Sequence, residues 1–184
     1  MQIFNSNKKK TIGILGGMGP EASANLYKKI IKLAQKNYEA KDDYEYPPMI
    51  LFSLPMTDWG TTGFIHPESV KRQLIVGVKT LEKAGCDFII IGCNTVHYFH
   101  DQMQAAVKIP IINMISKTVK RVQERGFKKV AVLSTLSTNK LNIYQNEFQK
   151  VNIETIPITD AHQETITKVI SRGEAGTISK IDTH

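Results

Sequence analysis

The chain has 184 residues, of which 41% are hydrophobic and 22% are charged, and its formal net charge is +7. This length and composition allow a buried core and one domain, or two small domains in tandem. No run of about 18 apolar residues appears, and the first residues lack the apolar segment of a secretory signal, so we expect a cytoplasmic protein with no membrane partner. The lysines are scattered along the sequence, which argues against nucleic acid as a partner and leaves an anionic metabolite or a solvated surface.

Cys86 and Cys93 are the two cysteines, too few and too poorly spaced for a disulfide framework or a zinc knuckle, so we expect reduced thiols. His97, His100 and Asp101 are close in sequence, but two histidines and one carboxylate without a further partner nearby are a common coincidence. We therefore expect no metal site. The sequence also lacks the G-x-S-x-G elbow of a serine hydrolase.

The first half of the chain alternates between apolar runs and amphipathic segments. Strands are predicted at residues 11–17 and 48–55 and in the run that ends at Cys93. A helix is predicted over 20–36, with Pro20 near its start and an apolar face of Ala22, Leu26, Ile30 and Leu33. A second helix is predicted over 68–85, with Gly85 as its stop and an apolar face of Val70, Leu74, Val78 and Leu81.

The second half continues this alternation. Helices are predicted near 101–107, 116–126, 139–150 and 162–173, strands at 128–134 and 153–158, and a further apolar segment at 109–115. Regular alternation of strand and helix predicts an α/β fold on a mainly parallel sheet that is buried on both faces.

The two halves share a short stretch of internal sequence similarity. KKTIGILGGMG begins at residue 9 and KKVAVLSTLST begins 119 residues later, and both run from two lysines through an apolar strand into small residues. This similarity fits two similar α/β halves, each bringing a loop of small residues to a shared cleft. It equally fits the general similarity of parallel strands, and both interpretations stay open.

The loop GGMGPE, residues 16–21, leads from the first strand into the first helix. Its glycines allow close approach of a ligand, and a helix start directs free N–H groups at an anion. The loop lacks the Lys-Ser/Thr of a P-loop and the G-x-G-x-x-G spacing, so the sequence favours nucleotide binding only weakly. A small carboxylate suits it equally well, and so does a turn without a ligand.

Cys93 ends its strand and is followed by Asn94, Thr95 and a predicted helix. A thiol near a helix start has a stabilised thiolate and can act as a base or nucleophile, and the two polar residues add hydrogen-bond donors for an acidic substrate. Free cysteine is also a common core residue, and Cys86 fits that description. The polar pair after Cys93 favours the functional interpretation for this thiol.

Three segments together, TIGILGGMGPEAS, GCNTVHYF and VAVLSTLSTNKLNIY, resemble the aspartate racemase branch of the aspartate/glutamate racemase family, over about residues 10–172. The resemblance implies a cofactor-independent amino-acid racemase, a homodimer, with two similar domains of mainly parallel sheets and flanking helices around the active site. In such enzymes one cysteine removes the α-proton and another returns a proton to the opposite face. Cys93 matches the first cysteine, and the residues that would bind the substrate are Met18, Gly19, Asn94, Thr95, Ser137 and Thr138.

The sequence departs from the family pattern in three places. Ser137 and Thr138 stand where the family usually has Gly-Thr, and the segment SLPMTDWGTTG has no arginine to bind a side-chain carboxylate. The second cysteine, expected in a Gly-Cys-Thr-Glu motif, is absent, and the internal offset places it beyond His184. We therefore expect a first α/β domain at 1–112, carrying Cys93, and a second domain at 113–184 that is incomplete.

The expected function is thiol-based racemisation of a small acidic amino acid, with activity in doubt because the second cysteine is absent. Two alternatives stay open. One is a decarboxylase or isomerase of small dicarboxylates that uses a single thiol. The other is a remnant that binds such ligands without catalysis. Cys86 cannot replace the second cysteine, because it lies seven residues before Cys93, roughly 23 Å along an extended strand.

Overall fold

A computed structural model describes residues 9–60 and 63–177 and divides the chain into two compact units. The first unit consists of the described parts of Met1–Pro55, Gln73–Gly92 and Asp101–Ile112. The second unit consists of the described parts of Met56–Arg72, Cys93–His100 and Asn113–His184. The last change of unit falls between Ile112 and Asn113, and the division into domains at that point stays a prediction.

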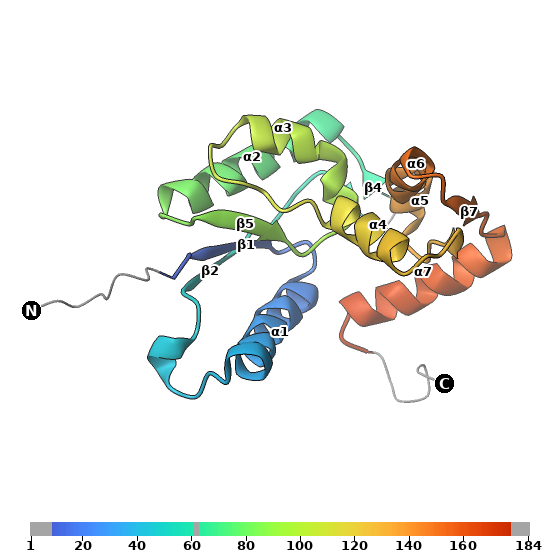
Figure 1. The fold of residues 1–184 in the computed structure, drawn as a ribbon. Helices are drawn as coiled ribbons and strands as arrows, with labels where there is room; N and C mark the ends of the chain where they lie inside the picture. The colour runs from blue at the N-terminus through green and yellow to red at the C-terminus, as the bar shows by residue number, and fades with distance from the viewer. Residues whose placement is uncertain (1–8, 61–62, 178–184) are drawn as a thin grey trace, which may run out of the picture. The chain divides into compact units, whose positions relative to one another are not determined.

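The first unit is built on three parallel strands in the order β2-β1-β5. These are β1 (Ile12–Gly16), β2 (Met49–Ser53) and β5 (Phe88–Ile91) (Figure 1). The central strand β1 buries Ile14 and Leu15 completely. The parallel α/β sheet that the sequence predicts is therefore present, with β2 as an edge strand.

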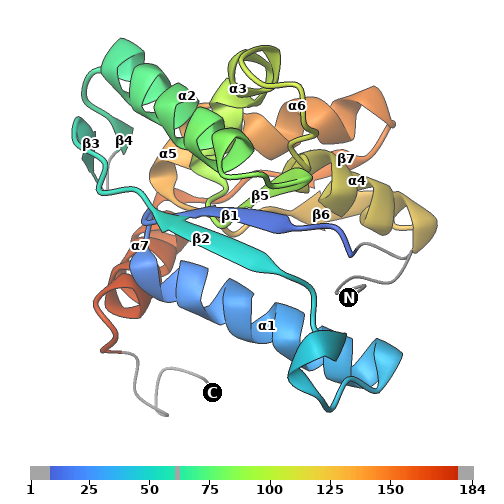
Figure 2. The same ribbon diagram turned by 90° about the vertical axis from the view of Figure 1, so that its left-hand side faces the viewer.

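Helices cover both faces of this sheet. α1 (Pro20–Tyr38) lies against one face, and α2 (Pro67–Lys83) lies against the other (Figure 2). The predicted apolar face of α2 is confirmed, because its four residues have no exposed surface. The short elements η1 (Asp43–Glu45) and α3 (His100–Ala105) complete the regular structure of these segments.

The predicted apolar face of α1 is partly wrong. Ala22 and Leu33 are exposed, whereas the buried positions are Ser23 and Ala34. The helix approaches the sheet so closely that a Cβ built on Gly16 would lie 2.5 Å from the Ser23 Oγ atom. Small side chains permit this approach, so α1 is rotated toward Ser23 and Ala34 and away from Leu33.

The second unit holds two parallel strands, an antiparallel hairpin and several helices. The strands are β6 (Lys129–Ala131) and β7 (Glu154–Ile156), and the hairpin is β3 (Trp59–Gly60) with β4 (Gly63–Phe64). The helices are η2 (Thr95–Phe99), α4 (Met114–Glu124), α5 (Leu136–Lys140), α6 (Ile143–Lys150) and α7 (Asp160–Glu174). In each of β6 and β7 only the central residue is half-buried and the other two are exposed, so the expectation of burial on both faces fails here.

The core of the second unit lies between α4, α6 and β7. Its buried members are Ile115, Val119, Tyr144, Phe148 and Ile153. Within residues 9–60 and 63–177, no helix combines the length and the apolar character that crossing a membrane requires.

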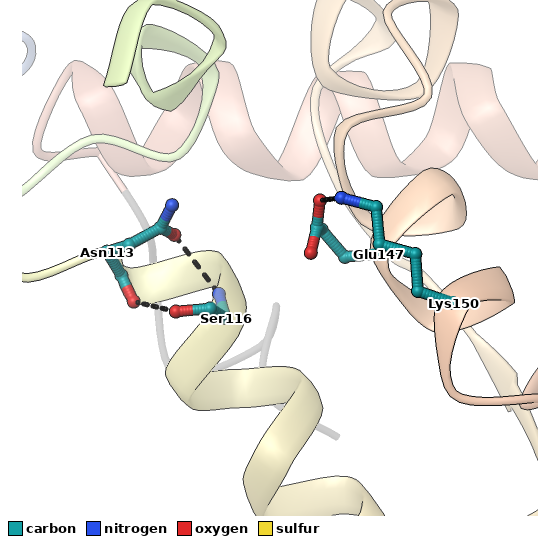
Figure 3. A network of polar contacts seen from close by, with 4 residues as sticks. All are labelled: Asn113, Ser116, Glu147 and Lys150. Atoms are coloured by element: carbon teal, nitrogen blue, oxygen red, sulfur yellow. Dashed lines mark hydrogen bonds and ion pairs between the residues drawn. The ribbon is translucent and has the colours of Figure 1, made fainter. Parts of the chain in front are cut away.

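The predicted apolar segment 109–115 is not a full strand. Ile111 forms a single parallel bridge to Ile89, and α4 begins within the segment at Met114. Asn113 caps this helix: its Oδ1 accepts from the Ser116 N–H at 3.1 Å, and the Ser116 hydroxyl donates to its carbonyl (Figure 3). This cap fixes the start of α4. A separate ion pair, between Glu147 and Lys150, links neighbouring turns of α6 (Figure 3).

Candidate active site

The glycine loop after β1 is fastened to the first turn of α1. The Ser23 hydroxyl accepts from the Gly17 N–H at 3.1 Å and donates to the Gly19 carbonyl at 3.0 Å. Gly17 has φ +94, and a Cβ there would lie 2.3 Å from the Leu54 carbonyl oxygen. At Gly19 a Cβ would meet nothing within 4 Å. Glycine is thus required structurally at Gly17, whereas Gly19 leaves open space beside the backbone, next to the buried Met18.

The Cys93 segment is held by a buried histidine. The Nδ1 atom of His97 lies 2.8 Å from the Cys93 carbonyl oxygen, and its Nε2 lies 3.2 Å from the Met114 amide nitrogen. The Met114 N–H can only donate, so Nε2 must accept, and Nδ1 carries the proton that it donates to Cys93. His97 is therefore a neutral imidazole that ties the start of α4 to the backbone of Cys93, whose side chain is 9% exposed.

Three threonine hydroxyls meet beside this segment. The Oγ1 atoms of Thr95 and Thr138 lie 2.8 Å apart, and Thr135 Oγ1 lies 3.3 Å from the first and 3.0 Å from the second. Thr95 and Thr138 are buried. Three hydroxyls in a ring supply one donor for each contact, so this threonine cluster satisfies its own hydrogen bonds.

Asn94 is exposed, in contrast to Thr95. Its Oδ1 accepts a hydrogen bond of 2.6 Å from the phenol of Tyr144 on α6. Burial raises the pKa of Tyr144, and a side-chain interaction with Thr118 partly opposes the rise. The phenol therefore stays protonated at neutral pH and remains a donor to Asn94.

The sequence suggested that Ser137 and Thr138 lie in a loop, but in the structure both belong to the short helix α5. Thr135 caps this helix, because its hydroxyl accepts from the Thr138 N–H at 3.3 Å. Ser137 is buried under the β3-β4 hairpin: a Cβ on Gly63 would lie 3.0 Å from its Oγ. The predicted helix 139–150 is interrupted at Asn142, whose φ of 51 is left-handed.

Five of the predicted site residues, Cys93, Asn94, Thr95, Ser137 and Thr138, belong to the second unit. Met18 and Gly19 belong to the first. Sequence reasoning missed Tyr144 and Thr135, and it considered His97 only as a metal ligand. Among the described residues, no three His, Cys, Asp or Glu side chains are grouped so that they could hold a metal ion.

Cys86 has the character of a core thiol. Its side chain is 4% exposed, and its Sγ lies 3.1 Å from the point that a Cβ on Gly13 would occupy. Burial raises the pKa of the Cys86 thiol, and the negative charge of Asp87 adds to the rise. Cys86 is therefore protonated at neutral pH.

Comparison with known proteins decides the family. Residues 15–180 match the Asp/Glu/hydantoin racemase family. The chain belongs to this family. It is 34% identical over 160 residues to the broad-specificity amino-acid racemase RacX of Bacillus subtilis, a match that covers 87% of this chain and 69% of RacX.

Two solved members of the racemase family have the same fold. The crystal structure of an aspartate racemase homologue from Pyrococcus horikoshii matches with a TM-score of 0.74 and 29% identity, over 89% of this chain and 70% of that one. The aspartate racemase of Picrophilus torridus matches with a TM-score of 0.73 and 28% identity, over 91% of this chain and 70% of that one. The resemblance that the three sequence motifs indicated is confirmed.

Proposed function

We propose that this chain is a cofactor-independent racemase-type enzyme that acts on small acidic amino acids, with Cys93 as the base. The observation that carries the proposal is the contact of Thr95 with Thr138. These two residues are 43 positions apart and belong to two different motifs, and Thr95 lies two residues after Cys93. The names of the similar proteins, an aspartate racemase and a broad-specificity amino-acid racemase, support the reaction class.

In the proposed reaction, the Cys93 thiolate takes the α-proton and becomes a thiol. The electron pair of the C–H bond stays on the substrate and is delocalised into its α-carboxylate. Hydrogen-bond donors must stabilise this added negative charge. Asn94 is an exposed donor beside Cys93, and Thr95 or Thr138 can contribute if a hydroxyl proton of the threonine cluster turns toward the substrate.

The remaining proposed contacts come from the glycine loop and from α5. Gly19 leaves room for a carboxylate to approach the backbone, and Met18 is proposed to pack against the substrate. Ser137, which packs against Gly63 of the β3-β4 hairpin, is proposed to line the substrate site. We also propose a homodimer, which light scattering on the purified chain would test.

Inversion needs a proton donor on the opposite face of the α-carbon. The 184 residues contain one other thiol, Cys86, whose burial in the core of the first unit argues against this role. For the chain of 184 residues we therefore propose exchange of the α-hydrogen without inversion. The lack of a second suitable thiol also favours a second candidate function, that of a decarboxylase or isomerase of small dicarboxylates that uses a single thiol.

The test is to incubate the chain with each enantiomer of aspartate and glutamate in deuterated water, and separately with malonate and maleate. Incorporation of deuterium into an amino acid supports the proposed racemase-type chemistry. Turnover of malonate or maleate alone would support the second candidate. Heat stabilisation by these acids without any turnover would indicate a protein that binds them and does not catalyse.

A further inference from the structure

We propose that Tyr144 is a positioning residue, which orients the side-chain amide of Asn94 so that its NH₂ group, and not its oxygen, faces an anionic substrate. The inference rests on the proposed function, because it assigns Asn94 to a carboxylate of the amino acid. It adds a residue to the site that lies 50 positions away in the sequence, on a different element.

The contact fixes which end of the amide is available. Tyr144 donates to Asn94 Oδ1 at 2.6 Å, and an amide oxygen can only accept, so the opposite edge of the amide carries both N–H donors. Without the phenol, the amide can turn by half a rotation and present its oxygen instead. A carboxylate would be attracted in the first orientation and repelled in the second.

Tyr144 is itself held firmly. It is 8% exposed, belongs to the core cluster of the second unit, and stacks on Phe148 with ring centroids 6.3 Å apart. Its ring therefore has little freedom to follow a rotating amide. The exposed Asn94 side chain gains a fixed orientation from a buried partner, which reduces the entropy lost when a ligand binds.

Burial also keeps the phenol in the state that this role requires. The pKa of Tyr144 is raised by desolvation, so the group remains a neutral donor across the pH range in which a thiolate at Cys93 would act. The donor to Asn94 is thus independent of pH under ordinary conditions.

Tyr144→Phe removes only the hydroxyl and keeps the ring in the core. The matched control is Tyr46→Phe, which removes a phenol that donates to the Ala40 carbonyl at 3.1 Å in the first unit. The probes are L-aspartate and D-aspartate, with binding measured by calorimetry and exchange measured in deuterated water. We expect Tyr144→Phe to weaken binding or slow exchange by about tenfold, the loss of one hydrogen bond, and Tyr46→Phe to leave both unchanged.

A double-mutant cycle shows whether Tyr144 acts through Asn94. Asn94→Ala removes the amide, so adding Tyr144→Phe to this variant should cause no further loss of binding or exchange. Asn94→Asp keeps an oxygen for the phenol but replaces the NH₂ donors by a second oxygen, and it should weaken aspartate binding more than Asn94→Ala does. A merely structural role of Tyr144 would give equal losses in both backgrounds and would overturn the inference.

The two failures are distinguishable. If the parent chain neither binds nor exchanges any acidic amino acid or dicarboxylate, the proposed function fails, and the inference fails with it. If the parent binds aspartate and Tyr144→Phe binds it equally well, the proposed function stands and only the inference is overturned.

Discussion

The hydroxyl oxygens of Thr95 and Thr138 lie 2.8 Å apart, both buried, although 43 residues separate them in the sequence. Thr95 follows Cys93 directly after Asn94, and Thr138 lies in the first turns of α5. The contact therefore ties the segment that carries the proposed base to the third of the three motifs, VAVLSTLSTNKLNIY.

Replacing Thr138 by valine should lower the stability of the fold. The change keeps the shape of the side chain but removes the 2.8 Å contact with the buried Thr95, which keeps only its longer contact of 3.3 Å with Thr135. We expect a cost of about 0.5–1.5 kcal/mol, the net value of one hydrogen bond. Thr80→Val, at an exposed threonine on α2 whose hydroxyl donates to the Val76 carbonyl, should change stability by less than about 0.5 kcal/mol. Urea unfolding of both variants measures the difference. Equal effects would show that the cluster contributes no specific hydrogen bonding.

Substitutions at the two glycines Gly17 and Gly19 of the loop after β1 should have different effects on stability. Gly17→Ala forces a side chain into a left-handed residue and against the Leu54 backbone, so we expect a loss of more than about 2 kcal/mol or failure to fold. Gly19→Val places its side chain in open space and should cost less than about 1 kcal/mol. If Gly19 approaches the ligand, Gly19→Val should nevertheless lose protection against heat by aspartate. Retained protection would make the loop purely structural.

The two thiols should react at different pH. Burial and Asp87 raise the pKa of Cys86, so its thiolate forms only in alkaline solution and iodoacetamide should modify it slowly near neutrality. Cys93, if it is the base, should react at lower pH. Cys93→Ser reports on Cys86 alone, and Cys86→Ala reports on Cys93 alone. Mass spectrometry across about pH 6–9 gives the rates, and identical profiles for the two thiols would contradict the assignment of Cys93.

Stability should fall in alkaline solution partly because of Tyr144. Its pKa is raised in the folded state, so its contribution is fully present below the unfolded value of about 10 and is lost as the pH rises through the folded value. Tyr144→Phe removes the titrating group and should flatten this decline relative to Tyr38→Phe, a control at an exposed tyrosine. Unfolding free energies measured from neutral to alkaline pH give the slopes, and parallel slopes for the two variants would contradict the prediction.

The sequence predicted the order of the elements well where the periodicity was strong. α2 buries its four predicted residues, because each reaches the core at a regular helical spacing. α1 was predicted with the wrong rotation, because close packing on the sheet selects small residues such as Ser23, which a search for large apolar side chains passes over.

The site was predictable only where a motif marked it. Cys93 and Asn94 stand out as a thiol and an amide at the end of an apolar run. Tyr144 ends the motif VAVLSTLSTNKLNIY, but the motif alone did not reveal its role. An aromatic residue on an amphipathic helix is ordinarily a core residue, and the bond of Tyr144 to Asn94 depends on tertiary structure. His97 could likewise be identified as a link between Cys93 and α4 only from its two hydrogen bonds.

The central claim is that Cys93 removes the α-proton of an acidic amino acid, and proton NMR of aspartate in deuterated water tests it most directly. The chain of 184 residues should exchange the α-hydrogen of one enantiomer with retention of configuration and form almost no opposite enantiomer. Cys86→Ala should behave like the parent, whereas Cys93→Ala should lose exchange by several orders of magnitude. Exchange that persists in Cys93→Ala at the rate of the parent would contradict the claim.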